Sequence, residues 1–307
     1  MAFKLKKQKG LEKQFQKISS RIIDAAVASL SQRSAATRGR AVHNARKQFK
    51  KLRALLRLIR EGLGDKTYDR EDDSLRKLGK PLSSVRDADV MIETLDGLLS
   101  HFKDQVGKGA FKTLRNKLVL RRRDLRKQIL ERQKAMSKVS ASARKVQKRI
   151  EDWPSLPDRF GVFNRGIRDT YEQGWRDMRE VLHGATDENL HEWRKSVKYL
   201  RHQLEILEAL CPSLIGEMVE QAHLLTDALG RDHDLVVLEE LTRDKLVESR
   251  KDGETELLTA LISQRRTELR SEALALGQRF YAETPKQFSQ RLKGYWKTWL
   301  SEASVAT

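Results

Sequence analysis

The sequence contains a single cysteine, Cys211, and this scarcity excludes two kinds of stabilisation. One thiol cannot form an intramolecular disulfide, and a thiolate-rich metal site needs several. Cys211 precedes Pro212 at the expected end of a helix, so we interpret it as a small apolar residue. The seven histidines include no i, i+4 pair with a carboxylate helper. We therefore expect neither a metal site nor a cofactor.

Proline and glycine are also rare, with 5 and 17 residues in a chain of 307. Leu, Lys, Arg, Glu and Ala dominate, and this composition favours helices over strands. No apolar run approaches the length of a membrane span, and residues 1–10 lack the apolar core of a signal peptide. We therefore expect a soluble, cytoplasmic, all-α protein with a sizeable core and no membrane partner.

Acidic residues are scarce in the first half of the chain. Residues 1–150 carry 40 basic and 15 acidic side chains, whereas residues 151–307 carry 22 and 28. The overall net charge of +19 indicates a polyanionic partner. Four lysines precede the first expected helix, and we interpret this basic start as a frayed helix end, with an additional phosphate-binding arm as the alternative. These lysines are Lys4, Lys6, Lys7 and Lys9.

A basic stretch of the sequence occurs twice. Residues 42–53 read VHNARKQFKKLR, and residues 190–201 read LHEWRKSVKYLR. Six identities fall in register at a separation of 148 positions, which indicates a duplicated structural unit. The identical pairs are His43 and His191, Arg46 and Arg194, Lys47 and Lys195, Lys50 and Lys198, Leu52 and Leu200, and Arg53 and Arg201.

At about 100° per residue, each copy divides into an apolar face and a basic face. Phe49 and Leu52 lie on the apolar face of the first copy, and Trp193 and Leu200 on that of the second. A solvated polar face usually mixes charge signs, but residues 38–60 hold nine basic side chains and no acidic one. We therefore interpret the basic faces as anion-binding surfaces. They comprise His43, Arg46, Lys47, Lys50, Arg53 and Arg57 in the first copy, and His191, Arg194, Lys195, Lys198 and Arg201 in the second.

Four helical elements recur in the same order in each half. Prolines in the stretch DWPSLP, residues 152–157, indicate a linker, and an extra helix follows the second half. We expect one domain over residues 10–302, built of halves 10–150 and 151–302. The expected helices of the first half span 11–32, 74–100 and 110–151, and the first motif helix follows a turn at 31–39 and ends at the EGLG stretch of residues 61–64. An acidic loop is expected at 65–73. In the second half the expected helices span 163–182, 189–210, 217–241 and 254–281, followed by 288–300.

Further arginines lie at helical spacing outside the two motifs. The run RRRDLR at residues 121–126 is echoed by RRTELR at residues 265–270. The pairs Arg86/Asp87 and Arg231/Asp232 are interpreted as structural, with orientation of groove arginines as the alternative. The additional candidate anion-binding residues are Arg122, Arg126, Arg168, Arg176, Arg266 and Arg270.

The run His-x-x-Arg-Lys-x-x-Lys-x-Leu-Arg, present twice, resembles the CHAD family, the conserved-histidine α-helical domain. The resemblance covers residues 10–300 and is especially close over residues 186–195. It implies two four-helix-bundle halves related by internal duplication and pseudo-twofold symmetry, around a basic central groove that holds inorganic polyphosphate. Arg168 and Arg176 partly match a basic helix of the family, although Glu172 and Gln173 stand where more arginine is expected.

The resemblance makes long-chain inorganic polyphosphate the expected partner, and polyphosphate granules the expected location. Such a ligand needs many cations in a row, and the release of its counterions supplies much of the binding free energy. Arginine offers bidentate contacts to phosphate and lysine a mobile point charge. His43 and His191 can donate hydrogen bonds to phosphate, or can orient neighbouring helices instead. We expect no catalysis, because no phosphate-cradling glycine-rich loop and no Glu-x-Glu-x-Lys triphosphatase signature is present.

Two other functions remain as alternatives. Non-specific nucleic-acid binding suits the charge, but the motif aromatics fall on the apolar stripes, where they cannot stack on bases. Phosphotransfer through an exposed histidine is disfavoured, because Lys47 and Lys195 stand one turn later, where a small residue would leave the imidazole accessible. The sequence leaves open the preferred chain length of polyphosphate, the oligomeric state and the purpose of binding.

Overall fold

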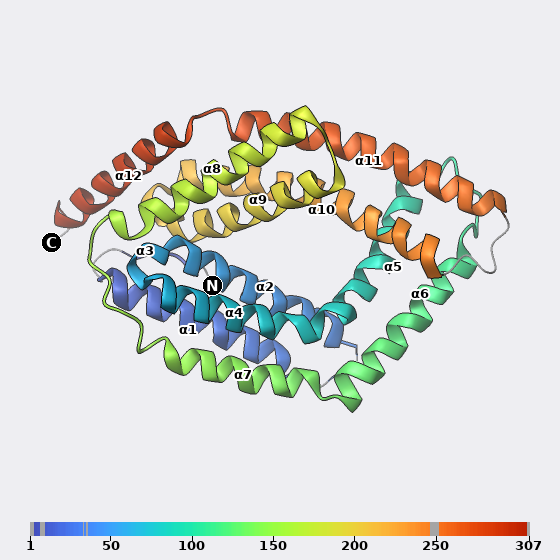
Figure 1. Cartoon of the computed structure of the whole chain (residues 1–307), viewed down its shortest axis with the longest axis horizontal. Coiled ribbons are helices and arrows are strands. Elements are labelled where there is room, and N and C mark those ends of the chain that lie inside the picture. Colours follow the sequence, from blue (N-terminus) through green and yellow to red (C-terminus); the bar gives the residue numbers. More distant parts are fainter. Residues whose placement is uncertain (1–2, 7–9, 33, 35, 246–251, 306–307) are drawn as a thin grey trace.

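The computed structural model describes residues 3–6, 10–32, 34, 36–245 and 252–305. Every regular element in these ranges is a helix, which confirms the all-α prediction (Figure 1). Among the described helices, none combines the length and the apolar character needed to cross a bilayer.

The first half begins with two long helices that pack side by side, α1 and α2 (Figure 1). The chain then turns through α3 and α4, and α4 packs on α2. Pro81 lies in the 3₁₀ turn η1, which separates α4 from α5. The bounds are α1 (Leu11–Leu30), α2 (Arg38–Leu58), α3 (Arg60–Leu63), α4 (Asp65–Gly79), η1 (Lys80–Leu82), α5 (Ser83–His101), α6 (Lys112–Leu125), η2 (Arg126–Arg132) and α7 (Ala135–Arg149).

In the second half, α8 packs on α9, and α9 packs on α10. Here the elements are longer and less interrupted than in the first half. The internal duplication, the pseudo-twofold relation and the division at residue 150 stay predictions. The bounds are α8 (Gly161–His183), α9 (Asp187–Leu207), η3 (Glu208–Leu210), α10 (Pro212–Lys245), α11 (Asp252–Phe280) and α12 (Pro285–Val305).

Two expectations about the first half are wrong. Asp65–Asp73, interpreted as a loop, belongs to α4, where Tyr68 and Glu71 are buried. The expected continuous helix 110–151 is divided by the π-helical stretch η2 and by Lys134, which has a φ of +50°. The division has a packing reason, because α6 packs on α5 whereas α7 packs on α1 and α4. One straight helix could not reach both sets of neighbours (Figure 1).

The main core joins the apolar faces of both motif helices. Phe49 and Leu52 on α2, and Trp193 and Leu200 on α9, are all buried in one cluster. Gly166 permits close approach of α8 to the end of α2, since a Cβ there would lie 2.3 Å from the carbonyl oxygen of Leu58. A second apolar cluster packs α5 and α6 against α10 and α11.

Truncation of the buried leucines tests this core. Leu52 and Leu200 are completely buried, so Leu52→Ala or Leu200→Ala should lower the free energy of unfolding by about 2–5 kcal/mol. Leu120→Ala is the matched control, because Leu120 is 49% exposed and should have little effect. Denaturant unfolding measures the difference. Equal effects at buried and exposed positions would contradict the described packing.

Candidate functional site

The motif helices α2 and α9 line one cleft of about 810 Å³, with α5 and α10 completing its walls. Helices α2 and α9 contact each other directly, and α10 packs on α5. Eight lysine and arginine side chains line the cleft together with four carboxylates. The cations are Arg46, Lys47 and Lys50 from α2, Arg86 from α5, Arg194, Lys198 and Arg201 from α9, and Arg231 from α10.

Eight of the predicted site residues therefore meet in one place. Helical spacing of three or four residues puts them on one face of each helix, opposite the buried apolar stripe. Thr186 helps to fix the start of α9, because its Oγ1 accepts a hydrogen bond from Asn189 N at 3.2 Å. The residues brought together are His43, Arg46, Lys47, Lys50, His191, Arg194, Lys198 and Arg201.

Arg53 and Arg57 lie beyond the cleft. Arg53 points towards α4 and donates from Nε and Nη2 to the two carboxylate oxygens of Asp72, at 2.8 and 2.9 Å. The guanidinium carbon of Arg57 lies 4.3 Å from the ring centroid of Tyr199. From two helical turns after Arg46 onwards, the basic residues of α2 therefore contact other protein groups instead of lining the cleft.

The cations of the two halves perturb one another across the cleft. Partial burial, followed by repulsion from Arg46 and Arg194, lowers the pKa of Lys50 to about 8. Water still reaches Lys50 in the open cleft, although protein groups surround it. Burial, followed by repulsion from Lys50 and Arg194, lowers the pKa of Lys198 well below its usual value. Since Lys50 belongs to α2 and Lys198 to α9, the two motifs form one electrostatic unit.

Carboxylates temper this repulsion. Burial raises the pKa of both Asp87 and Asp234, while nearby guanidinium groups oppose the rise. Arg86 donates a hydrogen bond to each carboxylate oxygen of Glu93 at 3.0 Å. Arg194 forms a longer ion pair with Asp234, with 3.9 Å between the nitrogen and the oxygen. The cleft is consequently basic overall but mixed in sign, which the motif helices alone did not indicate.

Five of the seven histidines line the cleft, although they are scattered in the sequence. Burial, followed by repulsion from neighbouring cations, lowers the pKa of His43 and of His191. The rings of His191 and His233 lie 4.7 Å apart, and burial lowers the pKa of His233 to about 4. Among the described residues, no group of three or more His, Cys, Asp or Glu is placed to hold a metal ion. The cleft histidines are His43, His191, His202, His223 and His233.

Three buried polar atoms of cleft residues have no hydrogen bond to another described group. They are Arg194 Nε, His191 Nδ1 and His202 Nε2. An unpaired buried donor is costly, so Arg194 Nε favours a ligand that brings acceptor oxygens, and a histidine nitrogen does so when it carries a proton.

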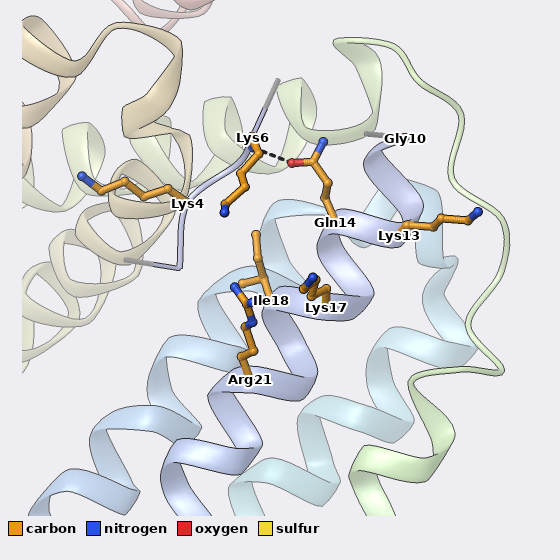
Figure 2. Close-up of a pocket in the computed structure, with 8 residues that line it drawn as sticks. All are labelled: Lys4, Lys6, Gly10, Lys13, Gln14, Lys17, Ile18 and Arg21. Atoms are coloured by element: carbon orange, nitrogen blue, oxygen red, sulfur yellow. Dashed lines mark hydrogen bonds between the residues drawn. The ribbon is translucent and has the colours of Figure 1, made fainter. Parts of the chain in front are cut away.

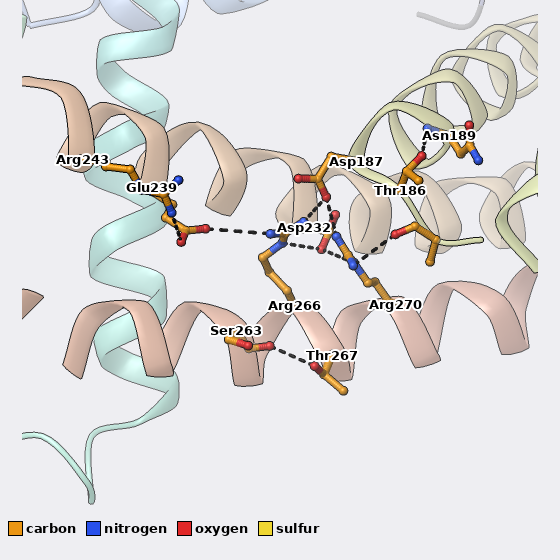
Figure 3. Close-up of polar contacts among 11 residues, drawn as sticks. Thr186, Asp187, Asn189, Asp232, Glu239, Arg243, Ser263, Arg266, Thr267 and Arg270 are labelled. Atoms are coloured by element: carbon orange, nitrogen blue, oxygen red, sulfur yellow. Dashed lines mark hydrogen bonds and ion pairs between the residues drawn. The ribbon is translucent and has the colours of Figure 1, made fainter. Parts of the chain in front are cut away.

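Arg266 and Arg270 lie on α11, against two aspartates rather than in the cleft (Figure 3). Each donates from Nε to Asp232 Oδ1 at 3.1 Å, and each donates from Nη2 to Asp187. Asp232 is buried on α10, and Asp187 begins α9. This arginine–aspartate cluster fixes α11 against the other two helices and leaves little capacity for a ligand.

Arg122 and Arg126 have a similar structural setting in the first half. Arg126 donates to Asp89 at 2.7 Å, and Arg122 lies 4.0 Å from the same carboxylate. Gly39 makes room for this pair, since a Cβ there would lie 2.3 Å from Arg126 Nη2. Asp89 and Asp232 thus hold arginines, whereas Asp87 and Asp234 face the cleft.

The remaining predicted residues are exposed and paired locally. Arg176 on α8 pairs with Glu172, Arg168 lies 3.5 Å from Asp169, and Lys195 pairs with Glu192 at 2.7 Å. None of these three residues lines the cleft.

A smaller cavity of about 220 Å³ continues from the cleft towards α6. It shares Asp87, Met91 and Val237 with the cleft and adds Arg121 to the cations along this path. Sequence reasoning missed Arg121 and the α5 and α10 cations Arg86 and Arg231. Arg121 stands in the RRRDLR run, and Arg86 and Arg231 stand in the arginine–aspartate pairs that we interpreted as structural, although both arginines line the cleft.

The sequence matches the family model of the CHAD domain over residues 21–243. The fold is similar to the crystal structure of the CHAD domain from the plant Ricinus communis, with 19% identity, a TM-score of 0.61, and 90% of this chain and 94% of that chain covered. It is also similar to PptA from Streptomyces chartreusis, with 13% identity, a TM-score of 0.59, and 90% and 100% covered. No curated protein matches the sequence.

Loss of Asp232 tests the structural role of the arginine cluster. Asp232→Asn should lower the free energy of unfolding by about 3 kcal/mol, because it removes the buried partner of two guanidinium groups. Asp124→Asn is the matched control and should change little, because Asp124 and Arg123 form an exposed pair at 3.7 Å. Denaturant unfolding measures both variants. A stability of Asp232→Asn equal to that of the wild type would contradict the role of the cluster.

Proposed function

The chain belongs to the CHAD domain family, and from that premise we propose that it binds long-chain inorganic polyphosphate without catalysing a reaction on it. The observation that carries the proposal is the cleft, in which cations from both motif helices face a common space. A polyphosphate chain presents anionic oxygens at every unit, so it can neutralise α2 and α9 at once.

The individual contacts follow from the side chains. Arg46 and Arg194 offer planar, multiple donors to phosphate oxygens, and Lys50 and Lys198 offer point charges one turn away. The unpaired Nε of Arg194 is a ready donor. Arg266 and Arg270 act indirectly in this proposal, by holding α11 in place.

The composition of the cleft favours a bare phosphate chain over a nucleic acid. Its described lining includes no Phe, Tyr or Trp, so it lacks the large aromatic side chains on which the bases of single strands stack, and histidine supplies its only aromatic rings. Binding to a nucleic-acid backbone is therefore the weaker alternative. Association with cytoplasmic polyphosphate granules is the corresponding proposal for location.

Neutralising the cleft should abolish binding while leaving the fold intact. Replacing Lys50, Arg194 and Lys198 with Gln should weaken long-chain polyphosphate binding by about a hundredfold or more, since several charge-assisted contacts are lost. The control replaces Lys286, Lys293 and Lys297 with Gln, removing the same charge from an exposed face of α12.

Calorimetric titration with polyphosphate, repeated with DNA and RNA as competitors, measures these affinities. Thermal melts check that each variant is folded. If polyphosphate binding weakens equally in the cleft variant and the α12 variant, the loss of affinity is explained by net charge and not by the cleft. Competition by nucleic acid as effective as that by polyphosphate would favour the alternative.

Binding should also weaken as pH rises. The pKa of Lys50 is about 8 in the empty cleft, and a bound anion raises it by favouring the ammonium form. Affinity should therefore fall by up to about tenfold per pH unit above 8 for each lysine that loses its proton. Below pH 6.5, protonation of His43 and His191 should strengthen binding.

Titrations at constant ionic strength between pH 6 and pH 10 measure this dependence. Replacing Lys50 and Lys198 with Arg keeps the charge at high pH and should flatten the alkaline limb. An alkaline limb that is flat already in the wild type would show that neither lysine contacts the ligand.

A further inference from the structure

Residues 3–6 are anchored rather than frayed. Leu5 is buried and donates its backbone N–H to the carbonyl oxygen of Ile206 at 3.1 Å. Lys4 forms an ion pair with Glu208, and Lys51 Nζ lies 5.1 Å from the ring centroid of Phe3. The interpretation of a frayed helix end is therefore wrong for residues 3–6, and Lys7 and Lys9 lie outside the described residues. This segment instead forms one wall of a cavity (Figure 2).

The N-terminal cavity has a volume of about 510 Å³ and lies between this segment and the first turns of α1. Its floor contains Ile18 and Gln14, which are 5% and 6% exposed. Gln14 Oε1 accepts a hydrogen bond from the backbone N–H of Lys6 and so joins the floor to the wall (Figure 2). The charged lining residues are all cations, namely Lys4, Lys6, Lys13, Lys17 and Arg21.

Two carboxylates beside the N-terminal cavity make contacts with the protein. Glu208 pairs with Lys4, and Asp158 accepts a hydrogen bond from the backbone N–H of Leu11. Within the described part of the chain, the side chains of Lys6, Lys13 and Arg21 have no ion-pair partner. The charges of these three side chains are therefore available to a ligand.

The spacing of the α1 cations makes this arrangement unfavourable without an anion. Lys13, Lys17 and Arg21 recur at intervals of four residues, so like charges stack on successive turns. Further along the same helix, Asp24 pairs with Arg144. Of the α1 cations that line the cavity, Lys13 and Arg21 have no such ion pair among the described residues.

We propose that the N-terminal cavity is a second anion site, which takes a compact run of linked phosphate groups. Its volume lies within the usual range of about 300–1,000 Å³ for small-molecule sites, and its cations suit an anion with several charges. It shares no lining residue with the cleft, so it does not depend on the proposed function. The phosphates can belong to the end of a polyphosphate chain or to a small phosphorylated molecule.

The test uses the full chain and two probes, inorganic tripolyphosphate and ATP. Titrations start from the cleft variant, in which Lys50, Arg194 and Lys198 are Gln, and this variant should still bind tripolyphosphate. Adding Lys6→Gln, Lys13→Gln and Arg21→Gln should weaken that binding by about tenfold for each lost charge-assisted contact. Adding Lys286→Gln, Lys293→Gln and Lys297→Gln instead should change it by less than about twofold, since distant exposed charges are screened.

If ATP binds as tightly as tripolyphosphate, the phosphate groups in the cavity belong to a small phosphorylated molecule. If ATP does not bind, they belong to the end of a polyphosphate chain. The proposal is overturned if the N-terminal substitutions leave tripolyphosphate binding unchanged, or if the α12 control weakens it equally. Binding of long-chain polyphosphate, measured in parallel on the wild type and the cleft variant, reports separately on the cleft.

Discussion

The structure depends on one constraint: the cations of α2 and α9 cannot move apart, because the same two helices bury their other faces in a shared core. Phe49 and Leu52 on α2 and Trp193 and Leu200 on α9 fix the helices through apolar contacts. Lys50 and Lys198 then remain within range of each other's charge, and the pKa of each is lowered. Coulomb repulsion grows as water is removed, so the fold maintains a repulsion that a polyanion can relieve.

The cleft remains compatible with a folded empty protein because other groups limit its charge. Asp87 and Asp234 face the cations, and its five histidines include four whose pKa is lowered, which keeps them neutral near pH 7. Outside the cleft, Asp89 and Asp232 hold arginines of the outer helices in fixed positions. These four aspartates thus have two roles. Two of them lower the net positive charge of the cleft, and two join the helices around it.

Sequence periodicity predicted the helices and the basic faces, because both depend on contacts within a few residues. Periodicity could not predict which basic residues face the cleft. Arg53 pairs with Asp72 and Arg266 with Asp187, and both ion pairs join helices that are separate in the sequence. Residues 65–73 were expected to form a loop because they carry many charged side chains. They form a helix instead, because Tyr68 and Glu71 are buried against the rest of the protein. The convergence of the histidines arises from the fold alone, because α2, α9 and α10 contribute them from separate parts of the chain.

Thermal unfolding of the empty protein tests the repulsion most directly. Lys50→Met and Lys198→Met together keep the length of the side chains but remove their charges, so the double variant should melt above the wild type. Long-chain polyphosphate should raise the Tm of the wild type by binding the folded state and should raise that of the variant far less. A variant that melts below the wild type would contradict the repulsion, because these lysines would then stabilise the empty fold.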